Sequence, residues 1–382
     1  MAREIEGGFL REAEAHPYIE DLGSLPAEEK ERLLRTGVDV TGAGRAGTFM
    51  QLDQSVVHCR SDQEGVEVLN IREALAKYPW AEEYFGRLIP LLPEERKSGQ
   101  PLSGFFVRVL PGVAARYPVQ ASLYIGHEGL AQKVRNLVIV EEGASLDLIT
   151  GCATGAFVHR GLHVGITETY VKKGGKLTST MIHNWGEDVV VRPRGATLVE
   201  EDGVFLSNYV CLSGVKSLLM YPVTNLAGRD AVARYNTILI APPGTKMDTG
   251  SKVNLGAPGA RAELIARTIT TGGEIISRGH IVAEVAGVRG HLECRGLMLS
   301  ERGRIYAIPE LEALVANVEL SHEAAVGKIA EEEIEYLMAR GLDEDEATAT
   351  IVRGFLNVRI EGLPTVLQEE IEKAVAASRL GI

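Results

Sequence analysis

Residues 137–150 read LVIVEEGASLDLIT, an aliphatic run, a polar turn around Gly143 and a second aliphatic run. Comparable turns recur at residues 172–177 (KKGGKL) and 193–198 (PRGATL), although their spacing is not a fixed period. Glycine permits the positive φ that a tight corner requires. Many short strands with repeated corners and almost no helical pattern predict a β-solenoid or a β-sandwich for residues 101–328.

The regions before and after these strands are predicted to be mainly helical. Before them, helices are expected at residues 26–34, 71–78 and 81–89, and a strand at residues 48–58, from their proline and glycine boundaries and apolar spacing. We therefore divide the chain into an N-terminal helical region (1–100), a β core (101–328) and a C-terminal helical region (329–382). The two helical regions are expected to cover the ends of the stack.

The C-terminal region carries the clearest helix signals. Residues 331–340 have acidic residues in the first turn and end before Gly341, which suits the helix dipole. Asp343 is expected to cap a second helix, with Glu346 at the capping-box position. The apolar residues of these helices are Ala347, Ile351, Phe355 and Leu356, followed by a last helix opening at Pro364.

Composition limits the class of protein. The chain has 382 residues, 45% of them hydrophobic and 24% charged, which is typical of a globular protein. A net charge of -12 argues against nucleic acid or an anionic membrane as the main partner. No apolar stretch has the length of a membrane span, and no signal-peptide core follows the N-terminus, so a cytoplasmic location is expected.

Several common nucleotide and hydrolase motifs are absent or misleading. Residues 42–47 (GAGRAG) match G-x-G-x-x-G, but the strand-like sequence after them is not the helix that a dinucleotide site needs. No P-loop occurs, so any ATP hydrolysis must come from another subunit. No G-x-S-x-G is present, and isolated histidines such as His16 and His58 fit surface or core positions.

One group of residues suggests metal chemistry. Cys294 precedes the adjacent pair His322 and Glu323 in the same C-terminal stretch of the β core. A thiol, an imidazole and a carboxylate suit an exchangeable iron or iron–sulfur site. Adjacent residues of a strand point to opposite faces, so a single site would use only one of the pair, and we favour Glu323. The four cysteines (Cys59, Cys152, Cys211 and Cys294) form no C-x-x-C pair, and each one taken alone also fits a buried apolar position.

The chain resembles the SufB/SufD family of iron–sulfur cluster assembly scaffolds over most of its length, from about Thr36. The resemblance is carried by SGFFVRVLPGVAARYPVQASLYI (103–125), VRNLVIVEEGASLDLITGCA (134–153), STMIHNWGED (179–188), ECRGLML (293–299) and VELSHEAAVGKIAEEEIEYLMARGL (318–342). It implies a right-handed parallel β-helix between helical ends. It also implies that the C-terminal helices dock a SufC-type ATPase, so the chain would be a scaffold for building a transient cluster and not itself an enzyme.

The resemblance is closer to SufB, because cysteines stand at SufB-like positions. It implies that Cys152 receives sulfur from a cysteine desulfurase or carrier protein. It further implies that Cys294 builds the cluster with Glu323 and His322, and that sulfur moves through the β-helix interior. A reduced flavin has been discussed for the family, although nothing in this sequence supports one.

The sequence departs from SufB in three ways. The N-terminal part is shorter, Ser321 replaces a usual glutamate, and a further cysteine and histidine are missing near Gly303 and Tyr306. A compact homodimeric scaffold is therefore expected, with a SufD-like heterodimer as the other arrangement. The alternatives are a SufD-like accessory subunit with idle cysteines and, more distantly, a solenoid enzyme acting on polysaccharide. The second would need paired carboxylates, which the acids Asp147, Glu168, Asp188 and Glu284 do not form in the sequence.

Overall fold

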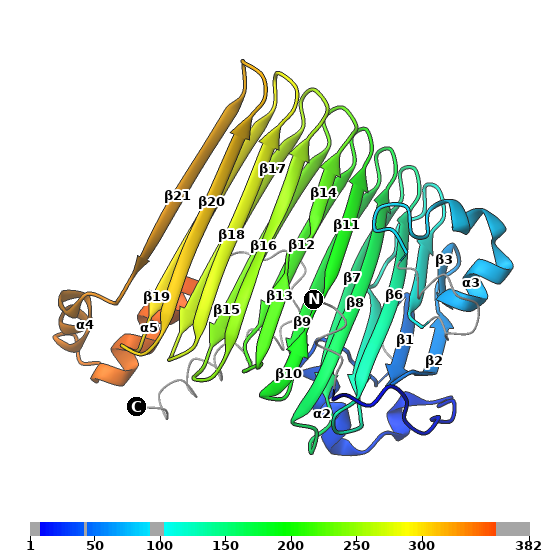
Figure 1. Ribbon diagram of the computed structural model, residues 1–382, viewed down its shortest axis with the longest axis horizontal. Coiled ribbons are helices and arrows are strands. Elements are labelled where there is room, and N and C mark those ends of the chain that lie inside the picture. The colour runs from blue at the N-terminus through cyan, green and yellow to red at the C-terminus, as the bar shows by residue number, and fades with distance from the viewer. Residues whose placement is uncertain (1–7, 42–43, 92–102, 357–382) are drawn as a thin grey trace.

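The computed structural model describes residues 8–41, 44–91 and 103–356. These residues form a β-solenoid in which two long sheets face each other, with short helices near the two ends (Figure 1). The strands of successive rungs run parallel, and among the described strands only the pairs β1–β2 and β3–β4, at the N-terminal end, are antiparallel. The predicted parallel β-helix is thus confirmed, and the sandwich is excluded.

The first sheet contains ten strands, and Cys152 and Cys294 lie in it. In spatial order these strands are β2 (Ser55–Ser61), β1 (Gly47–Leu52), β5 (Val119–Ile125), β7 (Ser145–Thr154), β9 (Lys176–Asn184), β12 (Val204–Cys211), β15 (Val232–Ala241), β17 (Arg261–Thr270), β19 (Arg289–Met298) and β21 (Glu319–Gly327).

The second sheet contains eleven strands because two of its rungs are each split into two short strands. Its strands are β3 (Val66–Asn70), β4 (Phe105–Val109), β6 (Ala131–Val140), β8 (Arg160–Val171), β10 (Asp188–Val191), β11 (Arg194–Val199), β13 (Ser217–Met220), β14 (Val223–Leu226), β16 (Lys246–Leu255), β18 (Glu274–Ala283) and β20 (Arg304–Ala313). Inward side chains of both sheets form one continuous core, rich in valine, leucine and alanine.

The corners along one edge of the solenoid repeat a single turn. The backbone N–H of Gly143 donates to the carbonyl of Lys173 (2.9 Å), and that of Gly174 donates to the carbonyl of Glu201 (2.8 Å), so each turn stacks on the next. Figure 1 shows these turns as the row of loops at the top. The positive-φ residues of the row, one for each rung, are Gly112, Gly143, Gly174, Asp202, Asp230, Gly259, Gly287 and Asn317.

The third turn expected from sequence, at residues 193–198, is wrong. The corner after Gly174 is at Asp202, whereas Pro193 lies between β10 and β11 within one side of a rung. Proline has no backbone N–H and interrupts a strand ladder. Pro222 separates β13 from β14 in the same way on the next rung, since β11 pairs with β14.

The N-terminal part contributes to the sheets as well as to the helices. Helices are present at α2 (Ala27–Leu34) and α3 (Ile71–Lys77), as predicted. The strand expected at residues 48–58 is the hairpin β1–β2, which turns at Asp53 with φ 55°. Because β1 pairs with β5 and β3 with β4, the β structure begins well before residue 101. A short 3-10 helix, η1 (Leu22–Ser24), precedes α2.

The helix predicted at residues 81–89 is mostly wrong. Only a 3-10 helix, η2 (Pro79–Glu83), forms, and the chain then turns at Gly86 with φ 76°. The backbone N–H groups of Gly86, Leu88 and Ile89 donate to the carboxylate of Glu168 at 2.6 to 3.1 Å. A buried carboxylate therefore takes the donors that a helix would have used.

The C-terminal helices are α4 (Glu331–Met338) and α5 (Glu344–Leu356). The predicted capping box is present, with Glu346 N–H donating to Asp343 Oδ1 at 2.7 Å and Asp343 N–H to Glu346 Oε2 at 3.2 Å. Of the predicted apolar stripe, Ala347 and Leu356 are buried, whereas Ile351 and Phe355 are half-buried. The predicted helix opening at Pro364 lies outside the described residues.

Helix α5 covers the face of the first sheet instead of the end of the stack. Its buried residues Ala349, Val352 and Leu356 pack on Ile238, Ile240, Ile269 and Leu297, which point outward from β15, β17 and β19. Within the part of the chain that the structure describes, β20 and β21 each pair on one side only. Among the described residues the last rung therefore has an open edge. The expectation that the C-terminal helical region covers this end also involves residues 357–382, which lie outside the described part of the chain.

Candidate functional site

Cys294 and the pair His322–Glu323 lie on neighbouring strands at the C-terminal end of the solenoid. In the register of β19 and β21, Leu292 lies beside His322, Glu293 beside Glu323 and Cys294 beside Ala324. Side chains alternate between the faces of a strand, so Cys294 and His322 share the inner face, and Glu323 lies on the outer face. The structure thus brings His322, two positions diagonal to Cys294, closer to the site than Glu323.

The outer face of these strands is a network of charges. Arg295 approaches Glu323 (Nη2–Oε2, 3.7 Å) and pairs with Glu293 (2.5 Å), which also pairs with Arg267 (2.8 Å). Glu323 therefore has a cationic partner that competes with a metal. We expected only one of His322 and Glu323 to share a face with Cys294, and the register agrees with this. Within one chain, however, that residue is His322 and not Glu323, which we had preferred.

The Cys294 thiol is held in the core near the open end. It is buried, and Ser277 on β18 donates its hydroxyl hydrogen to Sγ at 3.8 Å. Burial raises the pKa of Cys294, which favours the protonated thiol. A cavity of about 10 Å³, roughly the room for one water, adjoins the thiol. His322 is exposed on the edge strand, so the two candidate side chains differ in their access to solvent.

Cys152 lies farther along the same sheet, on β7, and also points inward. Burial raises its pKa strongly, so this thiol too is protonated at neutral pH. It lines a cavity of about 100 Å³ between the sheets. Pro193 and Pro222, which interrupt the opposite sheet, line the same cavity.

Four aromatic or imidazole side chains gather near Cys152. His183 is its register neighbour on β9, and Cys211 is the next residue in that row. The hydroxyl of Tyr209 bonds Nδ1 of His183 at 2.9 Å, and the rings of His163 and Trp185 pack against His183. Burial lowers the pKa of His163 to about 3 and that of His183 well below its ordinary value, so both imidazoles are neutral.

Two polar atoms of this group lack partners. Among the described residues, neither Nε2 of His183 nor Nε1 of Trp185 has a hydrogen-bond partner, although both are buried. Buried polar groups in proteins nearly always have a hydrogen-bond partner, so these two atoms are available to a molecule that enters this part of the interior. The group provides a neutral, polar environment for whatever reaches Cys152.

The cavities beside the two thiols share part of their lining. Tyr235, Thr237 and Gly250 line both the cavity at Cys152 and the small cavity at Cys294. Five strand-to-strand steps separate β7 from β19 in the sheet. At about 4.8 Å a step, the thiols are roughly 24 Å apart.

The remaining candidate residues are less informative. Cys211 is buried in the core, and Cys59 on β2 is half-buried; burial raises the pKa of each thiol to about 12. Of the acids considered for a polysaccharide site, Glu168 pairs with Arg135 and Asp188 with Lys216. These pairings leave the polysaccharide alternative without support.

Sequence analysis singled out none of the four residues that gather near Cys152, although the stretch 179–188, which carries part of the resemblance, contains His183 and Trp185. A usable signal was present for His183. Gly143 and Gly174 stand at successive corners, and the number of residues from Gly143 to Gly174 equals the number from Cys152 to His183. The corner spacing therefore predicts which residue stands beside the thiol.

Among the described residues, no helix is long and apolar enough to cross a membrane.

Comparison with known proteins places the chain in a family. Residues 123–355 match the family model described as "SUF system FeS cluster assembly, SufBD core domain". A protein of Archaeoglobus fulgidus named an iron–sulfur cluster assembly SufBD family protein is 47% identical over 350 residues, covering 91% of this chain and 94% of that protein. A similarly named protein of Methanothermobacter thermautotrophicus is 41% identical over 387 residues, covering 99% and 94%.

A relative with a more specific name covers less of the chain. The iron–sulfur cluster assembly protein SufB of Bacillus subtilis is 33% identical over 308 residues, which is 78% of this chain and 64% of that protein. All three relatives and the family model agree on one assignment. The chain belongs to the SufBD family of iron–sulfur cluster assembly proteins.

Proposed function

We propose that this protein is a SufB-like scaffold on which an iron–sulfur cluster is built and then released, and that it is not itself an enzyme. The observation that carries the proposal is the pair of inward thiols, Cys152 and Cys294, beside cavities that share part of their lining. In this proposal Cys152 accepts sulfur from a cysteine desulfurase or a carrier protein, and the cluster, which is the cargo, forms at Cys294. The protein would act in the cytoplasm.

The thiol chemistry requires a change of state at both cysteines. Burial raises the pKa of both thiols, yet only a thiolate attacks sulfur or binds iron. Sulfur acceptance and cluster assembly therefore require the thiol proton to leave, as in any thiolate–metal site. Opening of the site by a partner would supply the solvent access that this step needs.

The open edge of the last rung supports a second subunit. Tyr306 and Val326 of β20 and β21 are 49% and 40% exposed, and the edges of these strands are unpaired among the described residues. An exposed strand edge is a template for pairing with another chain. We propose that a second copy, or a SufD-like partner, pairs there and brings two half-sites with Cys294 and His322 together.

The loss of cluster caused by substituting His322 or Glu323 tests which of the two side chains accompanies Cys294. After anaerobic reconstitution with iron and sulfide, we expect His322→Ala to lose more cluster than Glu323→Ala, because His322 shares the face of Cys294. Visible absorption and bound iron and sulfide are the measurements. Equal or larger loss in Glu323→Ala would show that the ligand comes from the outer face. A wild-type protein that retains no cluster would contradict the scaffold function itself.

The ATPase is proposed to dock on α4. Tyr336 and Met338 are 55% and 43% exposed on this helix, whereas the apolar face of α5 is already buried. We expect Tyr336→Asp to weaken the complex with a SufC-type ATPase by tenfold or more in co-purification and titration, since a central aromatic contact typically contributes at least about 2 kcal/mol.

The matched control for this docking test is Tyr117→Asp. Tyr117 is also 55% exposed but lies just before β5, away from the C-terminal helices. Equal weakening by both variants, or by neither, would contradict docking on α4.

The SufD-like accessory function is the second candidate. It is favoured by one observation, the burial of both cysteines in the core as protonated thiols. An accessory subunit would form the ATPase complex but hold no cluster in reconstitution. The two candidates therefore differ in one measured quantity, the iron and sulfide retained by the purified protein.

A further inference from the structure

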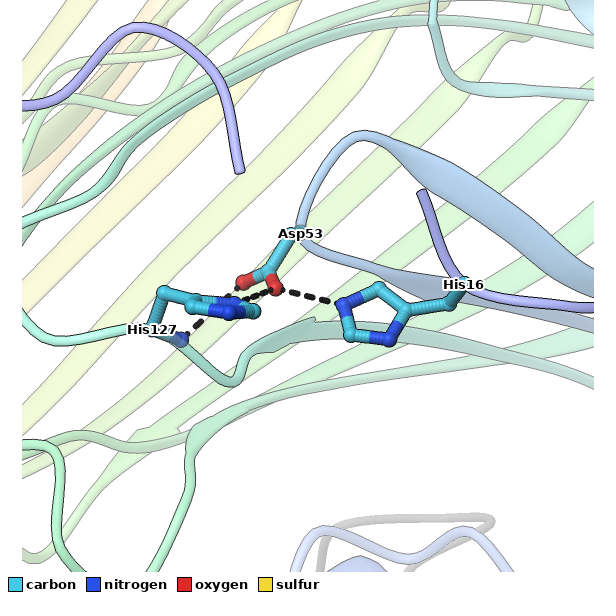
Figure 2. A group of neighbouring side chains, drawn as sticks. All are labelled: His16, Asp53 and His127. Carbon is cyan, nitrogen blue, oxygen red and sulfur yellow. Dashed lines mark hydrogen bonds and ion pairs between the residues drawn. The ribbon is translucent and has the colours of Figure 1, made fainter. Parts of the chain in front are cut away.

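A second set of metal-binding side chains lies at the opposite end of the solenoid, far in sequence from Cys294. His16 comes from the N-terminal segment, Asp53 from the β1–β2 turn and His127 from the loop between β5 and β6. Figure 2 shows the two imidazole rings on either side of the Asp53 carboxylate. The three positions are widely separated in the sequence, so only the fold brings them together.

The fold brings three donor atoms close to one another. Oδ2 of Asp53 is 2.8 Å from Nε2 of His16 and 2.5 Å from Nδ1 of His127, and one ligand atom from each residue lies within 4.8 Å of the others. Two imidazole nitrogens and one carboxylate oxygen are the donor set of mononuclear Fe²⁺ sites with open positions, and they also suit Zn²⁺ and Co²⁺.

Hydrogen bonds already fix the orientation of the Asp53 carboxylate. Oδ1 of Asp53 accepts the backbone N–H of Gly126 at 2.7 Å, which leaves Oδ2 to face the imidazoles. The Asp53 carbonyl accepts hydrogen bonds from the side-chain amides of Gln51 and Gln132, both at 2.8 Å. Such supporting hydrogen bonds orient a ligand and tune its metal affinity.

The charge of Asp53 also favours a cation. Its side chain is fully buried, and its ion-pair partners among the described residues are the two histidines, which are charged only if protonated. A buried carboxylate without a permanent cationic partner is costly, and a divalent ion would neutralise it. The side chains of His16 and His127 are 23% and 41% exposed, so an ion and its water ligands can approach from solvent.

We propose that His16, Asp53 and His127 bind one divalent first-row transition-metal ion, with Fe²⁺ the form that the donor set fits best. Each imidazole nitrogen that now shares a hydrogen with Oδ2 would lose that hydrogen, to solvent or to the other ring nitrogen, and present its lone pair to the metal. The backbone N–H of His16 already donates to Ser55 Oγ at 3.0 Å. The ion would therefore fasten the N-terminal segment to the first rung of the solenoid.

The test uses tag-free full-length protein carrying Cys294→Ser, so that the proposed cluster site does not contribute. Anaerobic titrations with Co²⁺, Fe²⁺ and Zn²⁺, each added alone, should show one equivalent bound. His127→Ala and His16→Ala should weaken binding by at least about 100-fold, since the loss of an outer-shell partner alone costs 10–100-fold. The ion should raise the thermal midpoint of the parent and not of the variants.

The control is His159→Ala, an exposed histidine on the neighbouring β7–β8 loop, which should bind like the parent. His127 lies on a surface loop, so His127→Gln provides a second variant if His16→Ala fails to fold. No stoichiometric binding by the folded parent, or equal binding by His127→Ala, would overturn the proposal. A thiolate-to-cobalt charge-transfer band would place the ion on a cysteine and would overturn it as well.

Discussion

Replacing Cys294 with serine is expected to reduce the iron and sulfide retained after anaerobic reconstitution to background. A serine hydroxyl keeps the shape of the side chain and the approach of Ser277, but it does not supply the thiolate that binds iron in clusters. Visible absorption, iron and acid-labile sulfide are measured on the purified protein. The loss should be larger than for any substitution on β21, because Cys294 is the one thiol on the inner face of the last two rungs in the described residues.

The matched control is Cys211→Ser. Cys211 is also a buried, inward thiol of the same sheet, and burial raises its pKa to about 12. If the Cys294→Ser protein keeps the wild-type absorption, Cys294 is not the cluster ligand. If Cys211→Ser loses the signal equally while both proteins remain folded, the assembly depends on the interior as a whole and not on the site at the open end.

Replacing Glu168 with alanine is expected to destabilise the fold by about 3–5 kcal/mol, the usual cost of breaking a buried ion pair. Glu168 is fully buried, pairs with Arg135 at 3.0 Å and accepts the backbone N–H groups that form the turn after η2. Its removal leaves three backbone donors without their acceptor and takes away the carboxylate partner of the buried Arg135 guanidinium, which keeps its hydrogen bonds to the carbonyls of Ile89 and Pro90. The thermal midpoint should fall by roughly 4–6 °C.

Calorimetry or circular dichroism measures this effect, with two comparisons. Glu168→Gln should lose less, because an amide oxygen still accepts the backbone hydrogens. Glu201→Gln alters the exposed pair with Lys173 and should leave the midpoint unchanged. A Glu168→Ala protein as stable as wild type would show that the ion pair contributes little beyond the cost of burying it.

Strand texture and corner glycines are local signals, and they predicted a β-solenoid or a β-sandwich; the family resemblance then favoured the parallel β-helix. Gly143 and Gly174 stand at true corners, and the helices α2, α3, α4 and α5 begin and end near their predicted residues. The errors arise where a distant group decides the local structure. The segment at 81–89 turns because Glu168 binds its backbone, and Pro193 resembles a corner but interrupts a strand.

The candidate site shows the same limit. Cys294 and His322 were found by residue type, but which of His322 and Glu323 accompanies the thiol depends on the register of β19 and β21. Register is decided by the corners on both sides of a rung, and these are not all marked by glycine: Asp202 and Asn317 occupy two of them. His16, Asp53 and His127 meet only because the N-terminal segment folds back on the first rung, which no local pattern encodes.

The stacked corners have a consequence for how the distance between the two thiols evolves. Each rung runs from one positive-φ corner to the next over a nearly constant length of chain, and its strands run in parallel register with their neighbours. Loss or duplication of one whole rung between β7 and β19 would keep Cys152 and Cys294 facing inward. It would change their separation by about 4.8 Å. The number of rungs thus sets the distance between the two thiols. Insertion of a whole rung can increase this distance without changing the residues around either thiol.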